Sequence, residues 1–287
     1  MSVTVKLLFS FLILLPFVWA ESPAPTQVAT TVVEHPAEMP KITENMTFEE
    51  SFRLGTKSYQ GKQFEDAIAY FNKALGLHPD NPEVLTNLGL SYFQSGKSGL
   101  SIAMLRRALS ADPAQETARA ALKFVLSKLE IKEIPHQIET YERLRSSVLN
   151  SASLASFHFL LALFLFCCGA IWLRFLGRRR KALALEEAPP GPPVVGIIFL
   201  IGFFVIFSLT VLKSYDLKVP RATIIADKVG AQIAPGEGQT ALFDLYTGFE
   251  VIIRNSANDW IQISYPGGLT GWVKKESLMA TSSKNAF

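Results

Sequence analysis

The chain contains few of the residues from which most catalytic, metal and disulfide sites are built. Its 287 residues include only two cysteines and four histidines. Cys167 and Cys168 are neighbours within an apolar run, so they cannot form a disulfide framework that ties distant segments together. The sequence also has no HExxH, CxxC or GxxxxGK[ST] pattern. We therefore expect a protein that is not an enzyme and that holds no metal or cofactor.

Charge is also scarce, and it is unevenly placed. Charged residues make up 18% of the chain and hydrophobic residues 49%, and the mean hydropathy is +0.24, which is too apolar for a simple soluble protein. The net charge is +3, but residues 154–213 alone carry six cations against two glutamates. Because the basic excess lies beside apolar segments, it indicates membrane topology rather than a surface that binds nucleic acid.

The first 45 residues read as a targeting segment followed by a spacer. Residues 1–20 have an early cation at Lys6, an apolar stretch up to Trp19, and small residues at Val18 and Ala20. This pattern predicts a secretory signal peptide, with an uncleaved signal anchor as the alternative. Residues 21–45 contain four prolines and no helical periodicity, which predicts a disordered spacer.

Residues 46–150 contain an internal repeat with a period of 34 residues. The residues of the first unit that recur in size class at this offset are Gly55, Ala67, Phe71, Ala74, Leu75 and Pro79, and their counterparts are Gly89, Ser101, Leu105, Ala108, Leu109 and Pro113. The offset is that of a helix-turn-helix repeat, in which small residues let two helices approach and a proline ends the second helix. On these residues the segment resembles the tetratricopeptide repeat family. A third unit begins at Glu116 without a matching second helix, and a helix over 137–150 is expected to cap the array.

The resemblance implies a concave groove that binds partner proteins, lined by the first helix of each unit. The candidate protein-binding residues of this groove are Phe52, Thr56, Tyr59, Thr86, Leu90, Phe93 and Phe124. An aromatic groove would suit a partner's helix or an extended tail. The alternative for Tyr59 and Phe93 is that both side chains simply pack between repeats.

Two apolar segments, 154–173 and 194–212, are each long enough to cross a bilayer, since a helix rises about 1.5 Å per residue and the hydrocarbon core is about 30 Å thick. They are expected to be transmembrane helices, because neither has a polar face. The segment between them, 174–193, has five cations followed by a proline-rich stretch. Positively charged loops stay in the cytoplasm, so this pattern predicts an inner-membrane protein with both flanking domains on the periplasmic side.

Residues 219–280 change to short β-rich runs separated by turn signals, which predicts a small barrel, with 281–287 as a tail. The run Trp260 to Ile263, the turn at Pro266 to Gly268 and the strand Gly271 to Val273 resemble the bacterial SH3-like domain family. Trp260 and Trp272 are candidate surface residues of this domain. The alternative is that both belong to its core.

The predicted fold class is therefore a multidomain membrane protein with an all-α tetratricopeptide array, two transmembrane helices and a small all-β SH3-like barrel. This order of parts resembles the repeat-plus-SH3 component of the Bacteroides aerotolerance (Bat) operon. The resemblance implies an envelope scaffold that works beside von Willebrand factor A domain membrane proteins in oxidative-stress tolerance or envelope integrity. The alternative is a cell-wall tether, whose SH3-like domain binds peptidoglycan and whose repeats recruit a wall enzyme.

Overall fold

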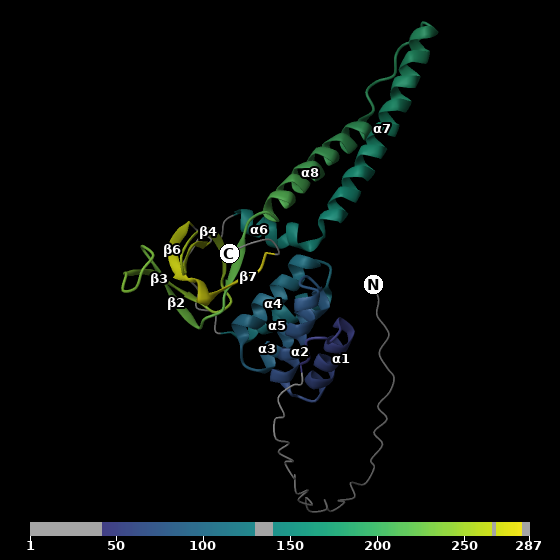
Figure 1. Ribbon diagram of the computed structural model, residues 1–287. Helices are drawn as coiled ribbons and strands as arrows, with labels where there is room; N and C mark the ends of the chain where they lie inside the picture. Colours follow the sequence, from purple (N-terminus) through teal and green to yellow (C-terminus); the bar gives the residue numbers. More distant parts are fainter. Residues whose placement is uncertain (1–41, 130–139, 266–267, 283–287) are drawn as a thin grey trace, which may run out of the picture. The chain divides into compact units, whose positions relative to one another are not determined.

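A computed structural model describes residues 42–129, 140–265 and 268–282 of the chain (Figure 1). The predicted signal peptide and most of the predicted spacer lie outside the described residues, as does most of the predicted tail. All described residues belong to one unit, Met39–Phe287. Along the chain this unit consists of a helical array, a pair of long apolar helices and a β-sheet.

The helical array has five helices that follow the predicted repeat. They are α1 (Phe48–Gln60), α2 (Phe64–Leu77), α3 (Pro82–Gln94), α4 (Ser98–Ala111) and α5 (Glu116–Lys128). Capping residues begin α1 and α3: the Thr47 hydroxyl accepts a hydrogen bond from the Glu50 amide, and the Asn81 side chain accepts from two amides of α3. Such caps satisfy amides that have no partner within the helix.

Small residues let paired helices approach closely, as the repeat pattern predicts. A Cβ atom at Gly55 would lie 2.7 Å from the Phe71 ring, and one at Gly89 would lie 2.9 Å from Leu105 Cγ. Phe71 is 1% exposed and packs in a cluster with residues of α2, α3, α4 and α5. Phe71, a position of the 34-residue repeat, is thus buried where the helices of the first unit meet.

A short helix, α6 (Thr140–Ser147), and one 3-10 turn at Leu149–Ser151 follow the array. The sequence predicts that a helix in this region caps the array. The polar contacts of Tyr141 and Arg145 instead go to Asp216 and Glu250, which lie beyond the apolar helices. Helix α6 therefore forms hydrogen bonds with the end of the second apolar helix and with the C-terminal sheet, both of which are distant from it in the sequence.

Among the described residues, two helices are long and apolar enough to span a membrane, α7 (Leu154–Ala184) and α8 (Val194–Asp216). They pack side by side as an antiparallel hairpin (Figure 1). Helix α7 does not end at residue 173 as the sequence predicts but runs on through the basic segment to Ala184. The cause is that residues 174–184 are mostly good helix formers and the first proline comes only at 189. The predicted loop is thus corrected to a helical extension followed by a shorter connection.

The C-terminal part of the unit is an antiparallel sheet of seven strands. The strands are β1 (Arg221–Ile224), β2 (Lys228–Gln232), β3 (Ala241–Tyr246), β4 (Glu250–Ala257), β5 (Trp260–Tyr265), β6 (Leu269–Lys274) and β7 (Leu278–Ala280), in the order β3-β2-β6-β5-β4-β1-β7. One face buries a single apolar cluster that includes Ile224, Leu245 and Ile263. The β-rich runs in the sequence account for five of these strands. They miss β2, which contains a glycine and few β-branched residues, and β7, which has three residues.

Candidate functional site

The middle of helix α4 is covered on all sides. Its residues Ser101 to Leu105 are consecutive, and each is at most 4% exposed. Successive residues of a helix point about 100° apart, so a helix covered on one face would expose some of these five. Helices α3 and α5 cover part of α4, and strands β1 and β7 cover the rest. The sheet therefore packs directly on the second helix of the second repeat.

Two glycines permit this contact between the array and the sheet. A Cβ atom at Gly99 would lie 2.4 Å from the Ile225 carbonyl oxygen, so any larger residue would displace backbone. At the turn before β4, Gly248 has a φ of +85°, and a Cβ atom there would lie 2.8 Å from Ile102 Cδ1. Only glycine adopts that backbone conformation readily. Side chains at either position would separate the sheet from α4.

A partly buried ionic cluster lies beside this contact and joins four parts of the chain. Arg145 of α6 donates to both carboxylate oxygens of Glu250 in β4, at 3.0 and 3.3 Å. Its Nε also lies 3.1 Å from Asp216 Oδ1 at the end of α8. Asp216 further accepts from Arg221 of β1 at 3.0 Å and from the Tyr141 hydroxyl at 2.9 Å. We call Arg106, Tyr141, Arg145, Asp216, Arg221 and Glu250 the junction cluster.

Arg106 connects the repeat array to the junction cluster. Its Nη1 donates to the Thr223 hydroxyl of β1 at 2.7 Å. Burial lowers the pKa of Arg106, while the charge of Glu250 acts in the opposite direction. For Glu250, burial alone would raise the pKa, but the charges of Arg106, Arg145 and Arg221 outweigh it and lower the pKa to about 2. Glu250 therefore stays ionised and neutralises cations that burial would otherwise disfavour.

The junction cluster also holds Tyr141 in its neutral form. Burial is the largest cause, followed by the hydrogen bond to Asp216 and the charge of Asp216, and together they raise the pKa of Tyr141 to about 12. Its hydroxyl thus remains a hydrogen-bond donor throughout the physiological range. No signal in the sequence points to this cluster, because its members are spread from Arg106 to Glu250 and come together only through the fold.

The structure separates the predicted groove residues into packed and exposed ones. The Phe52 ring lies 5.8 Å from the Phe71 ring and packs on the repeat core. Thr86 is 4% exposed, its hydroxyl donates to the Pro82 carbonyl at 2.7 Å, and the same hydroxyl lies 3.0 Å from Gln115 Oε1. The Thr56 hydroxyl donates to the Phe52 carbonyl within its own helix. Phe52 and Thr86 are therefore parts of the repeat packing and not open contact surfaces.

The exposed part of the groove lies at its third-unit end. The Phe93 and Phe124 rings meet edge to face with centroids 5.6 Å apart. Phe124 is 50% exposed, and the Lys128 ammonium lies 5.4 Å from the centroid of its ring. Tyr59 and Leu90 are half-buried on the first helices of the other units. We call Phe93, Phe124 and Lys128 the aromatic edge.

The two tryptophans of the sheet are both half-buried. The Lys274 ammonium lies 6.0 Å from the centroid of the Trp260 ring. Trp272 stands opposite Gln232 on one neighbouring strand and Gln262 on the other. Each tryptophan thus contributes to the sheet and still presents part of its ring to the surface.

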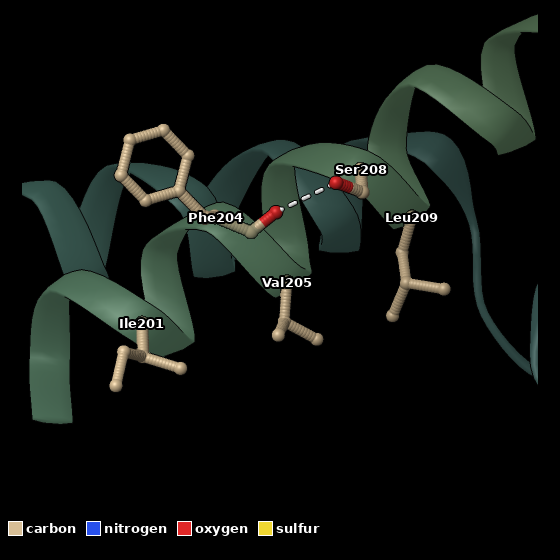
Figure 2. Close-up of a pocket in the computed structure, with 5 residues that line it drawn as sticks. All are labelled: Ile201, Phe204, Val205, Ser208 and Leu209. Carbon is tan, nitrogen blue, oxygen red and sulfur yellow. Dashed lines mark hydrogen bonds between the residues drawn. The ribbon is translucent and has the colours of Figure 1, made fainter.

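Helix α8 bears a shallow hollow, shown in Figure 2, that is lined by Ile201, Phe204, Val205, Ser208 and Leu209. Its only side-chain polar group is the Ser208 hydroxyl, which donates to the Phe204 carbonyl of the same helix. Within the described ranges, no three histidine, cysteine, aspartate or glutamate residues are grouped so that they could hold a metal ion. The hollow has the chemistry of a lipid-facing surface and offers nothing to orient a polar substrate.

Comparisons with known proteins agree with the repeat architecture. Residues 55–96 match a family described as TPR repeat, and residues 82–115 match one described as Tetratricopeptide repeat. Both matches fall within α1 to α5, so the tetratricopeptide identity of this part is confirmed. A search of curated proteins finds no match. Tetratricopeptide repeats mediate binding between proteins, which makes the aromatic edge the candidate functional surface.

Proposed function

We propose that this protein is a non-enzymatic, membrane-anchored scaffold that binds a partner protein through the concave side of its repeat array. The observation that carries the proposal is the contrast between the two sides of that array. The chain's own sheet covers α4, whereas α5 leaves half of the Phe124 ring exposed beside Phe93. Exposed aromatic side chains are frequent anchors in interfaces between proteins.

Helices α7 and α8 are the membrane anchor in this proposal. Their apolar windows are 11% buried within the protein, so most of their surface needs an apolar solvent. Cations concentrate in the last turns of α7, just before the α7–α8 connection, which supports a cytoplasmic connection and a periplasmic location for both domains in a bacterial inner membrane.

The C-terminal sheet is an SH3-like domain in this proposal, and the whole protein acts in an aerotolerance-type complex. The support is the order of the parts together with the Gly271–Trp272–Val273 strand, which forms β6. Von Willebrand factor A domain membrane proteins are the proposed partners. The proposed role is in oxidative-stress tolerance or envelope integrity.

The experiment is a crosslinking pull-down of the full chain from membranes, compared between wild type and the Phe124→Ala variant. Removal of an anchor side chain typically costs about 2 kcal/mol of binding free energy, or roughly thirty-fold in affinity. Leu77→Ala is the matched control, because Leu77 is 45% exposed on α2 and does not belong to the groove. We expect Phe124→Ala, and not Leu77→Ala, to reduce partner capture.

The competing function, a cell-wall tether, is tested in the same preparation. The part-exposed Trp260 ring beside Lys274 is the surface that would contact a glycan. Co-sedimentation of the full chain with purified peptidoglycan that is lost in Trp260→Ala, combined with capture that is insensitive to Phe124→Ala, would replace the scaffold by the tether.

A further inference from the structure

Helix α7 extends well beyond the point where its partner helix begins. A Cβ atom at Gly196, near the start of α8, would lie about 3 Å from Ile171 and from Trp172, and a Cβ atom at Gly202 would meet the Phe164 ring. Helix α8 therefore begins beside residues 171 and 172 of α7. The remaining part of α7, residues 174–184, has no partner helix and forms a basic extension, named here for its five cations.

The cations of the basic extension are all exposed. They are Arg174, Arg178, Arg179, Arg180 and Lys181. Arg174, Arg178 and Lys181 are spaced by four and three residues, which places them on one face of the helix. Leu173 and Leu176, which are 71% and 43% exposed, lie on a different face. Arg180 follows Leu176 by four residues and shares its face, so cations surround the extension, and we call the face with Arg174, Arg178 and Lys181 its cationic side.

The distance of this cationic side from the apolar segment determines which layer of a bilayer it would contact. The apolar part of α7, residues 154–173, spans about 30 Å as a helix, which is the thickness of the hydrocarbon core. Polar headgroups add roughly 5 to 8 Å on each side of that core. Arg174 and Arg178 lie within about 8 Å of the end of the apolar part, and long side chains such as that of Lys181 can reach back toward it.

We propose that the cationic side of the basic extension binds the phosphate headgroups of anionic phospholipids. The inference rests on the proposed membrane insertion of α7 and α8. Two observations favour anionic headgroups as the ligand. The three cations lie at the depth of the headgroup layer, and no carboxylate lies between Arg174 and Lys181 to neutralise them. Each cation close to an anionic surface is worth about 1 kcal/mol, or about fivefold in association.

Trp172 supplies a reporter next to the binding surface. The purified full chain is reconstituted into vesicles that contain phosphatidylcholine and phosphatidylglycerol, with bromine on the acyl chains of one lipid at a time. The difference in fluorescence between wild type and Trp172→Phe isolates the Trp172 signal, and bromine quenches it only at close range. Both leaflets have the same composition, so the orientation of the protein does not affect the result.

We expect brominated phosphatidylglycerol to quench Trp172 as if it associated at least about fivefold more strongly than phosphatidylcholine. The triple change Arg174→Gln, Arg178→Gln and Lys181→Gln should weaken this preference, whereas Arg174→Lys with Arg178→Lys should keep it. The matched control is Arg119→Gln, Lys123→Gln and Lys128→Gln on α5, which removes the same charge from exposed residues of the array and should leave the preference unchanged.

The outcomes separate this proposal from the one on which it rests. Equal quenching by both brominated lipids would show insertion of Trp172 without headgroup selection and would overturn the lipid proposal alone. Absence of quenching by either lipid would overturn membrane insertion and the lipid proposal together. A preference that the triple glutamine change leaves undiminished would refute the assignment to the cationic side, and would leave these three cations free for an acidic protein.

Discussion

Removal of the Glu250 charge should destabilise the contact between the sheet and the array at neutral pH. The ordinary pKa of a glutamate is 4.5, and that of Glu250 is about 2, a difference that corresponds to about 3 kcal/mol of stability. Because the pKa is lowered on folding, this stability is fully present above pH 4.5 and is lost as the pH falls toward 2. Glu250→Gln keeps the size of the side chain but leaves Arg106 and Arg145 with less compensating charge.

The measurement is urea unfolding of the full chain in detergent, followed by the fluorescence of Trp260 and Trp272 in the sheet. Glu250→Gln should lower the free energy of unfolding by about 3 kcal/mol at pH 7. It should also remove most of the dependence of stability on pH below 4.5.

Asp244→Asn is the control, since Asp244 pairs with Lys228 at 2.7 Å while their side chains are 41% and 57% exposed. An exposed pair of this kind contributes about 1 kcal/mol or less. A Glu250→Gln effect no larger than that of Asp244→Asn would refute the reasoning.

Three further predictions follow from the packing and the topology. Phe71→Ala removes a side chain that is 1% exposed and should lower the free energy of unfolding by about 3 to 5 kcal/mol; an unchanged melting temperature would place the ring outside the core. Gly99→Ala places a Cβ atom 2.4 Å from the Ile225 carbonyl oxygen, so it should lower the free energy of unfolding by about 1 to 3 kcal/mol and speed amide exchange in β1. Gly76→Ala, where the Cβ atom meets nothing within 4 Å, should do neither. Equal amide exchange in the two variants would contradict the contact between α4 and the sheet. Protease added to spheroplasts should degrade the array and the sheet and spare residues 174–193; protection of the sheet would contradict the proposed topology.

The repeat units could be predicted from the sequence because their signals are local. Gly55 and Phe71 recur 34 residues later as Gly89 and Leu105, and a helix pair needs only such short-range spacing. The apolar runs of α7 and α8 are equally local. The end of α7 could not be placed in the same way, because the cations that suggested a loop are also good helix formers.

The junction cluster could not be predicted because nothing local distinguishes its members. Arg145 meets Glu250 across 105 positions of the chain, and Tyr141 meets Asp216 across 75. Each residue alone reads as an ordinary surface charge or aromatic side chain. The arginine charges that lower the pKa of Glu250 against the effect of burial come together only when α4, α6, β1 and β4 are assembled.

The same contacts explain how an array of two and a half repeats can bury its core. About three repeats are needed for a free-standing array, and α5 begins a third unit that has no second helix among the described residues. In the first two units the second helix covers the first. Leu126 of α5 and Leu129, which directly follows α5, instead meet the turn at Gly248, which also contacts Ile102 of α4. The sheet thus takes over part of the place of the missing helix, while Phe124 on α5 stays 50% exposed.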